Sequence, residues 1–491
     1  MDTSVTTQQV FRKIALRITP FLFLCYILNF IDRVNIGFAK LQFLHDLGMS
    51  EAVFGAATGF FFVAYAAFEL PSNLMLAKAG ARATLMRIMV LWGLATVAQV
   101  FVQGPNSLYV LRFLLGAAEA GFFPGIILYL SYWFPDARRA RINSILLLAV
   151  PIAGMTGGPL SGIIMSSMND LGGLRGWQWL FIVEGVPALI LGLLAPLMLS
   201  NRPEQAAWLS DAERRLVASE LAASHPSTGE HASGELREIF RNPRFIGLAA
   251  IYFCVYVGLV GVTFWTPSIM KASGITSISM IGWLAGLISV VTMIGNLAIG
   301  FSSDRRLERR WHVGGCLLAT AVSLAALRYA VGHTVATVAL LAIAQTAMFT
   351  VPIVFWTIPA KLFQGRQAAG GIALISTVGS LGGTFASWLV GTMTAHSGTP
   401  YNGMVVVAAF LIGGAALLLR LVPRQDRLDR DSLNLSVHWR FERDSSYRSE
   451  SAVLIVARDS IHVATRPNIR TRSDFSVLPF SIFGEPIDRT Q

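Results

Sequence analysis

Two charged residues stand inside one long apolar stretch of the chain. The stretch Arg112–Pro135 reads RFLLGAAEAGFFPGIILYLSYWFP, and a helix of roughly 24 residues, rising about 1.5 Å per residue, is long enough to cross the hydrocarbon core of a bilayer. Arg112 and Glu119 are two helical turns apart, so both side chains project from nearly the same face. Because ionisable groups are costly inside a membrane, we expect this face to line a polar cavity.

A permanent cation beside a titratable acid suits the binding of an organic anion. Arginine keeps its charge and can hold a carboxylate through two parallel hydrogen bonds. Burial favours the neutral form of Glu119, whereas a nearby arginine favours the ionised form. The resulting hypothesis is that a proton reaching Glu119 frees Arg112 for the substrate. A purely structural salt bridge from Arg112 to Glu119 or to Asp32 is the alternative.

The elements that position these residues are predicted to be membrane-spanning helices. Of the 491 residues, 54% are hydrophobic and 14% are charged, and the mean hydropathy is +0.58. Twelve apolar runs of about 20 residues lie between Ile14 and Val422. The first, about Ile14–Ala39, has no small-residue cleavage site after it, so we predict a retained helix rather than a signal peptide.

The spans fall into two groups of six. We predict a first six-helix half at 1–200, a hydrophilic linker at 201–243, a second half at 244–423 and a polar, Arg-rich, disordered tail at 424–491. In the linker, Ser210 followed by Glu213 predicts a capping box at the start of a short amphipathic helix. The loop GFSSDRRLERR partly repeats SNLMLAKAGAR after the second span of each half, as a duplicated unit predicts.

The distribution of basic residues predicts the orientation of the chain. With the N-terminus in the cytoplasm, eleven Lys and Arg residues fall in loops on that side, against three on the other, namely Lys40, Arg175 and Lys271. This bias predicts cytoplasmic termini. Much of the net charge of +11 therefore reflects topology rather than nucleic-acid binding, and the rest lies largely in the Arg-rich tail. The three cysteines show no spacing typical of a metal site.

Several motifs resemble a known family. The loop Gly300–Arg310 is similar to a loop motif of the major facilitator superfamily, and Arg112–Pro135 closely resembles the span-four signature of its anion:cation symporter family. YILNFIDRVNIGFA, FELPSNL, GGPLSG and FWTIP are similar to that family as well. The resemblance implies an all-α membrane protein of twelve transmembrane helices, with two pseudo-symmetric six-helix halves. It also implies proton symport of carboxylates such as sugar acids, tartrate and aromatic acids.

The resemblance assigns roles to particular residues. It places the proton-coupling acids at Asp32 and Glu119 and the substrate-binding cations at Arg33 and Arg112, with a site tyrosine at Tyr65. Asp32 and Arg33 are neighbours in sequence and project about 100° apart. We therefore expect one to face the cavity and the other to face a neighbouring helix.

Further candidates come from the second half. Trp356 is a candidate cavity residue, and Thr377 and Ser380 stand where family members often carry asparagines. Ala77 replaces the aspartate of the first loop motif, and Val260 a common tyrosine. A gating role is predicted for the charged residues of the loop after the eighth span, namely Asp304, Arg305, Arg309 and Arg310.

The sequence therefore predicts a secondary transporter that imports a small organic anion with protons by alternating access. The alternatives are a carboxylate exchanger or facilitator, and a non-transporting membrane sensor that binds the same anion. No GxxxxGK[ST], HExxH or GxSxG motif occurs, so an enzyme is not expected. We expect no cofactor or metal beyond protons as the coupling ion. The expected partners are the substrate and the lipid bilayer, with no nucleic acid, for a monomer in a bacterial inner membrane.

Overall fold

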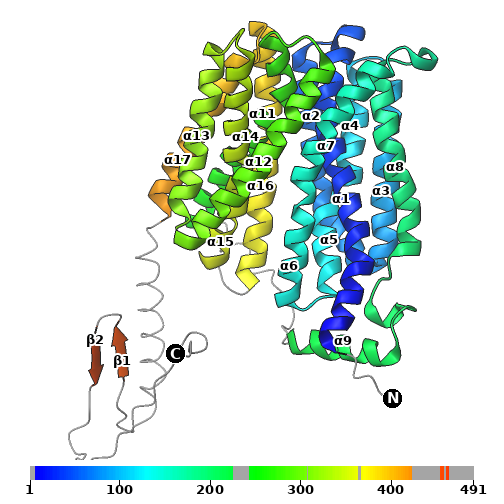
Figure 1. Cartoon of the computed structure of the whole chain (residues 1–491), viewed down its shortest axis with the longest axis vertical. Helices are drawn as coiled ribbons and strands as arrows, with labels where there is room; N and C mark the ends of the chain where they lie inside the picture. Colours follow the sequence, from blue (N-terminus) through cyan, green and yellow to red (C-terminus); the bar gives the residue numbers. More distant parts are fainter. Residues whose placement is uncertain are drawn as a thin grey trace, which may run out of the picture. The chain divides into compact units, whose positions relative to one another are not determined.

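The computed structural model describes residues 6–224, 243–306, 308–362 and 366–422, together with two short strands (Figure 1). The chain divides into two compact units, Met1–Arg424 and Gln425–Gln491. In the second unit, β1 (Leu454–Ala457) pairs antiparallel with β2 (Ser460–Val463). The prediction of a disordered tail otherwise lies outside the described residues, as does the linker segment 225–242.

The first unit is built from helices. Within the described residues, twelve spans are long and apolar enough to cross a membrane, which confirms the predicted all-α membrane fold. The first half contains α1 (Thr7–Asp46), α2 (Glu51–Ala79), α3 (Ala81–Ala98), η1 (Gln99–Phe101), α4 (Pro105–Glu119), α5 (Phe122–Ser131), α6 (Asp136–Leu147), α7 (Ala149–Ser167), η2 (Leu171–Gly173) and α8 (Gly176–Met198).

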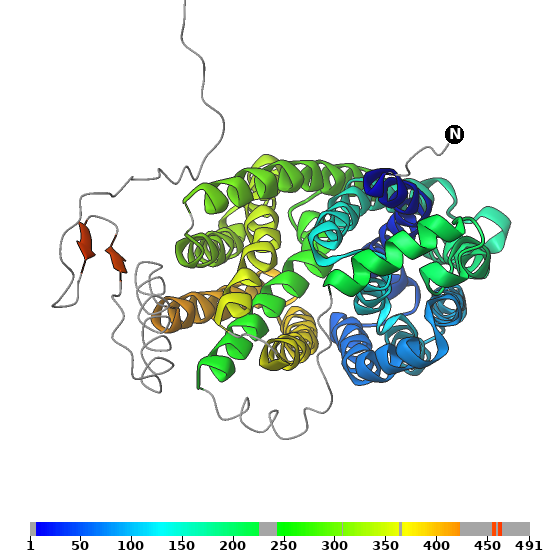
Figure 2. The same ribbon diagram turned by 90° about the horizontal axis from the view of Figure 1, so that it is seen from below.

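The linker and the second half are helical as well. The linker contains η3 (Pro203–Gln205) and α9 (Asp211–Ser224). The second half contains α11 (Pro243–Ala272), α12 (Ile278–Arg306), α13 (Arg310–Ala326), η4 (Leu327–Tyr329), α14 (Thr334–Phe355), α15 (Thr357–Leu362), α16 (Arg366–Ser397) and α17 (Tyr401–Leu421). Viewed from the end where α9 lies, the two groups of helices stand side by side, with α9 across the first group (Figure 2).

Helix α9 begins with the predicted capping box. The backbone N–H of Ser210 donates to the Glu213 carboxylate at 2.8 Å, and the N–H of Glu213 donates to the Ser210 hydroxyl at 3.3 Å. These bonds satisfy donors that the first turn of a helix leaves open. Lys13 at the start of α1 then pairs with Glu213 at 2.8 Å, which attaches α9 to the first half.

The sequence predicts one continuous helix for the fourth span, but the structure shows two helices. Helix α4 ends at Glu119, and Gly121 adopts the left-handed conformation at φ 83° before α5 begins. A side chain is strained in that conformation, and a Cβ here would come within 2.7 Å of the Ser72 hydroxyl. Arg112 and Glu119 both belong to α4, so they share a helix face as predicted, but Glu119 is its last residue.

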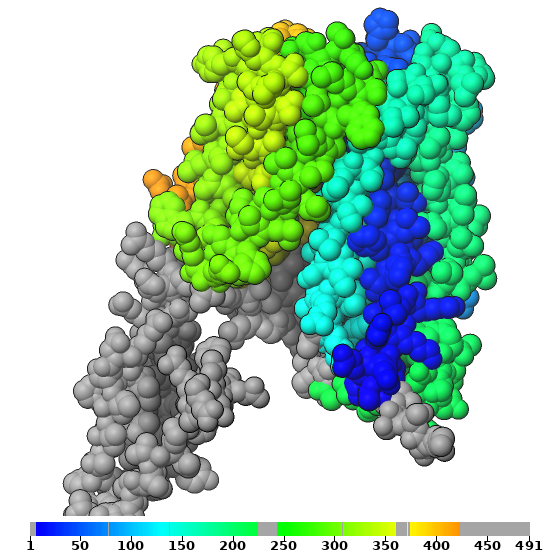
Figure 3. All heavy atoms as spheres, viewed as in Figure 1, coloured from blue at the N-terminus to red at the C-terminus, as the bar shows by residue number. Residues whose placement is uncertain are grey.

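The halves touch along two seams, α7 with α12 and α2 with α16. In the first seam, a Cβ on Gly158 would lie 2.8 Å from the Gly282 carbonyl oxygen, and a Cβ on Gly162 would lie 3.1 Å from Ser279. The glycine run of the fifth span thus permits close approach of the helices, as predicted. In the second seam the closely packed Gly55 lies near the start of α2, at the end remote from α9. On the face in Figure 3 the halves diverge toward the α9 end.

Candidate functional site

Glu119 pairs with an arginine of α1. Its side chain is completely buried. Oε1 accepts a hydrogen bond from Asn29 Nδ2 at 2.5 Å and forms an ion pair with Arg33 Nε. Oε2 has no partner in the described part of the chain. Asn29 and Arg33 lie one turn apart on α1, so one face of that helix holds the acid. Sequence reasoning had missed Asn29, although its spacing of four from Arg33 was a usable signal.

Arg112 is a buried cation with open hydrogen-bond donors. The side chain is 1% exposed, and its Nε and Nη1 atoms have no hydrogen-bond partner among the described residues. The guanidinium carbon lies 4.9 Å from the centre of the Phe61 ring, a cation–π distance. Asp32 and Glu119 are within electrostatic range, yet no described carboxylate comes within 4.0 Å of Arg112. In this conformation the salt bridge proposed as the structural alternative is therefore absent.

Asp32 faces a neighbouring helix rather than a cation. Its Oδ1 accepts from Asn35 Nδ2 at 3.0 Å, and its Oδ2 accepts from Trp92 Nε1 at 2.8 Å and Thr96 Oγ1 at 3.0 Å. Trp92 and Thr96 belong to α3, one turn apart. Arg33, by contrast, keeps 27% of its side chain exposed. The side chains of Asp32 and Arg33 thus point in different directions from α1, as their angular separation on the helix predicts.

Tyr65, the site tyrosine that the resemblance implies, lies beside Arg33. The Arg33 guanidinium carbon is 4.9 Å from the centre of the Tyr65 ring and 6.0 Å from that of Phe61. Phe61 is also the ring that covers Arg112. The two arginines therefore flank one aromatic surface of α2, which holds both cations without neutralising either one.

Residues of the second half gather around two tyrosines of α11. Trp356 Nε1 donates to the Tyr252 hydroxyl at 3.1 Å. A Cβ on Gly379 of α16 would lie 2.6 Å from the Tyr252 ring and 2.9 Å from the Tyr256 ring, so this glycine admits both rings. Tyr256 lies within electrostatic range of Arg33. Tyr256 thus brings the second half near Arg33, and sequence reasoning missed this residue.

The remaining two candidates on α16 have less distinctive surroundings. Ser380 is buried, and its hydroxyl donates to the carbonyl oxygen of Ser376 at 3.2 Å. Thr377 is half-buried. Both residues flank Gly379, where the α11 tyrosines pack, and a role for either in substrate binding stays a prediction.

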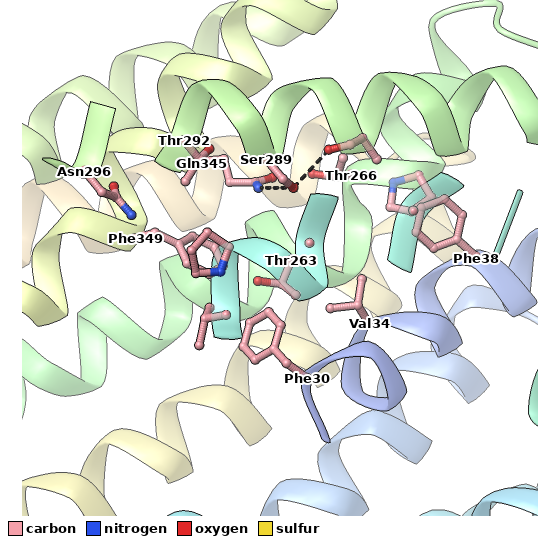
Figure 4. Close-up of a pocket in the computed structure, with 16 residues that line it drawn as sticks. Phe30, Val34, Phe38, Thr263, Thr266, Ser289, Thr292, Asn296, Gln345 and Phe349 are labelled. Carbon is pink, nitrogen blue, oxygen red and sulfur yellow. Dashed lines mark hydrogen bonds between the residues drawn. The ribbon is translucent and has the colours of Figure 1, made fainter. Parts of the chain in front are cut away.

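A cavity of about 70 Å³ lies between the halves on the α7–α12 side. Its polar side chains come from three helices of the second half, and Gln345 Nε2 donates to the Ser289 hydroxyl at 3.4 Å (Figure 4). Phe30 and Val34 of α1 form part of the apolar wall. None of the predicted site residues lines it. The polar lining residues are Thr263, Thr266, Ser289, Thr292, Asn296 and Gln345.

Three of these polar residues could have been identified from their spacing in the sequence. Ser289, Thr292 and Asn296 follow one another at intervals of three and four in an apolar span, which places them on one helix face. The face offers neutral donors and acceptors but no charge. It is suited to hydroxyl or amide groups of a ligand rather than to a carboxylate.

The predicted gating residues bind within their own half. Asp304 pairs with Arg309 at 2.7 Å, which joins the end of α12 to the start of α13. Arg310 donates to the carbonyl oxygen of Leu419 on α17, and Arg305 lies 5.1 Å from the Phe301 ring. Among the described residues, none of the four reaches the other half.

Lys40 requires a correction. The sequence pattern places it in a loop, but it lies inside α1, is 1% exposed and pairs with Glu51 at 2.8 Å. Its ammonium lies 4.1 Å from the Phe54 ring and 4.6 Å from the ring of Trp265 in the second half. It belongs to the contact between the halves on the side remote from α9.

Comparison with known proteins places this arrangement among transporters. The profile described as Major Facilitator Superfamily matches residues 22–280 and 273–457. The chain is 39% identical over 420 residues to the "Putative metabolite transport protein NicT" of Pseudomonas putida, covering 86% of this chain and 96% of that protein. It is 42% identical over 416 residues to a "Putative tartrate transporter" of Agrobacterium vitis, covering 84% and 91%.

A solved structure shows the same fold. A bacterial homologue of the human lysosomal transporter Spinster, described as inward-facing and unoccupied, superimposes with a TM-score of 0.67 at 18% identity. The match covers 85% of this chain and 98% of that one.

Proposed function

Because the chain belongs to the Major Facilitator Superfamily and is a multi-pass membrane transporter, we propose that it imports a small organic carboxylate together with protons. The observation that carries this proposal is Arg112, a buried guanidinium with two nitrogens that lack a hydrogen-bond partner in the described chain. Leaving such a group unpaired costs several kcal/mol, so the site is suited to an anion that arrives from outside. The printed names of the relatives, tartrate among them, suggest carboxylates.

The charge balance supports coupling to protons. Asp32 and Glu119 contribute two negative charges, and Arg33 and Arg112 contribute two positive charges, so the cluster sums to zero. A substrate carboxylate would add one negative charge in a buried place. A proton bound with the substrate would restore neutrality and reduce the cost of moving the loaded site through the membrane.

The position of the ion pair changes the coupling scheme. Glu119 holds Arg33 rather than Arg112. A proton on Glu119 would remove the charge that holds Arg33 and leave this arginine available as a second contact for the anion. Arg112 would bind the carboxylate first, and Arg33 would complete the site once Glu119 is protonated. The acids Asp32 and Glu119 keep their proposed coupling role in this scheme.

The neutral part of the substrate would extend toward the second half. The polar lining of the cavity, to which Ser289, Thr292 and Gln345 belong, offers hydroxyl and amide groups (Figure 4). Tartrate and sugar acids carry hydroxyl groups that such a lining can bind. The first half would thus bind the charged carboxylate of the substrate, and the second half would bind its neutral polar groups.

The distribution of basic residues supports an orientation with the α9 side in the cytoplasm. With the α9 side in the cytoplasm, the closed seams lie on the outer side and the halves diverge toward the cytoplasm, which is an inward-facing state of an alternating-access cycle. We further propose a bacterial inner-membrane location, a monomeric carrier and protons as the sole coupling ion.

Transport into proteoliposomes tests the proposal. Purified protein is reconstituted and offered tartrate, a sugar acid or an aromatic acid with an alkaline interior. We expect at least one of them to accumulate above its external concentration, and a protonophore to abolish the accumulation. Equal uptake without a pH gradient would indicate a facilitator, and uptake only into anion-loaded vesicles an exchanger. Binding without any flux would indicate a sensor.

A further inference from the structure

A third buried acid lies behind the site, on α8. Glu184 is the one charged residue of that helix and is 4% exposed. Its Oε1 accepts a hydrogen bond from the Ser161 hydroxyl at 3.3 Å, and its Oε2 has no partner in the described residues. No lysine or arginine of the described chain forms an ion pair with it. An ionised carboxylate in such a place is strongly disfavoured.

Asn35 connects Glu184 to Asp32. The Asn35 amide nitrogen donates to Asp32 Oδ1 at 3.0 Å, and the same side chain contacts the Glu184 carboxyl. Asn35 Oδ1 is buried and has no hydrogen-bond partner among the residues described. Turning the amide around would set this oxygen against the Asp32 carboxylate, so the amide orientation is fixed while Asp32 is ionised.

Two unsatisfied acceptors therefore occur on side chains that touch one another. Asn35 Oδ1 and Glu184 Oε2 both lack a donor. An ionised Glu184 has no hydrogen to offer, whereas the protonated acid has one O–H group. A proton on Glu184 Oε2 removes the charge from an oxygen that has no donor, and it supplies an O–H group on a side chain adjacent to the unpaired Asn35 Oδ1.

The helices around Glu184 offer no compensating charge. Helix α8 packs against α1, α3 and α7. From α1 the titratable group facing it is Asp32, which is negative. Helix α7 has no charged residue, and the charged residues of α3 are Arg82 and Arg87 in its first half, whereas Gly185 packs against Val97 near the other end of α3.

We propose that Glu184 carries a proton in this conformation and that Asn35 couples this proton to the charge on Asp32. While Glu184 is protonated, Asp32 keeps its charge and accepts three hydrogen bonds. In the alternative state the proton passes from Glu184 to Asp32 Oδ1, so that one O–H bond breaks, one forms and the net charge of the pair is unchanged. The Asn35 amide, which can donate to only one carboxylate, then turns to donate to the ionised Glu184. The role of this pair in transport rests on the proposed function, but the protonation of Glu184 does not.

Infrared spectroscopy tests the protonation directly. Purified wild-type protein at neutral pH should show the carbonyl band of a protonated carboxyl group, and part of the band should shift when the protein is made with isotope-labelled glutamate. That component should be lost in Glu184→Gln and retained in Glu204→Gln, a matched change of an exposed residue on η3. A band that does not shift with labelled glutamate overturns the proposal without any variant. A band unchanged in Glu184→Gln overturns it as well.

The pH profile of transport tests the coupling to Asp32. Wild-type uptake should fall at alkaline pH, where the Glu184–Asp32 pair loses its one proton to solvent and so adds a negative charge beside the anion site. Glu184→Gln cannot ionise, so its alkaline fall in uptake should be lost or shifted to higher pH. If uptake by Glu184→Gln falls at alkaline pH in the same way as wild-type uptake, the proposed coupling of Glu184 to Asp32 is contradicted. If the wild-type protein shows no proton-driven uptake, the proposed function fails, and the infrared band still decides the state of Glu184.

Discussion

Replacing Arg112 by lysine separates charge from hydrogen-bond geometry at the centre of the site. Lysine keeps the positive charge, but its ammonium cannot present two parallel N–H groups to a carboxylate. In the structure, Nε and Nη1 of Arg112 have no partner among the described residues, so these donors are available to a ligand. Losing one charge-assisted hydrogen bond costs about 1.5–3 kcal/mol. At about 1.4 kcal/mol per factor of ten, Arg112→Lys should weaken substrate binding roughly 10- to 100-fold.

Calorimetric titration of purified protein measures this effect. The ligand is tartrate, or whichever of tartrate, a sugar acid and an aromatic acid binds the wild type most tightly. Arg139→Lys is the matched control, because Arg139 pairs with Asp136 at 2.5 Å outside the site and should leave the Kd unchanged. An unchanged Kd for Arg112→Lys would refute the assignment of Arg112 as the hydrogen-bonding anchor of the anion.

Three further outcomes are expected. Glu119→Gln should abolish accumulation driven by a pH gradient in proteoliposomes while substrate exchange continues, and undiminished accumulation would contradict its role in coupling. Gly158→Val should reduce transport at least several-fold without preventing membrane insertion, because even a Cβ there would lie 2.8 Å from the Gly282 carbonyl oxygen; wild-type uptake rates would show that the α7–α12 seam is not needed. Burial alone would raise the pKa of Glu213, but hydrogen bonds from Lys13 and Ser210 hold it below its usual value. A lowered folded-state pKa stabilises the docking of α9 above the ordinary glutamate pKa, and this stabilisation is lost as the pH falls through the lowered value. The protection of the α9 amides, taken relative to the intrinsic exchange rate at each pH, should therefore fall in acid in the wild type, whereas Glu213→Gln should be weakly protected at every pH.

The membrane-spanning helices could be predicted because the insertion of a segment into the membrane depends on its local hydrophobic composition. Apolar runs of sufficient length are needed wherever backbone groups must be satisfied within a helix. The break after Glu119 could not be predicted in this way. It depends on Gly121 lying against Ser72 of another helix, and that approach exists only in the folded bundle.

The charged residues of the site were predicted, but not their pairing. The interior position of Arg112 and Glu119 was visible in the sequence, and the family resemblance indicated Asp32 and Arg33. Which acid meets which cation depends on helix rotation and packing, so the Arg33–Glu119 pair emerged only from the structure. Lys40 was misassigned for the same reason, since its partners lie on other helices.

Glu184 was missed although its signal was as clear as that of Glu119. A single acid in the apolar run GWQWLFIVEGVPALILGLLAPLM meets the criterion that an ionisable residue within a span is a candidate functional group. Glu119 has an arginine on its own helix, whereas Glu184 has no charged residue on its helix to mark it as part of a site.

Proton movement driven by substrate tests the central claim most directly. Proteoliposomes with a trapped pH-sensitive dye and equal pH on both sides receive the substrate anion outside, with the membrane potential clamped. The account predicts that the interior becomes acidic as the anion enters, and that the signal is absent in Glu119→Gln. Entry of the anion without any acidification of the interior would contradict proton symport.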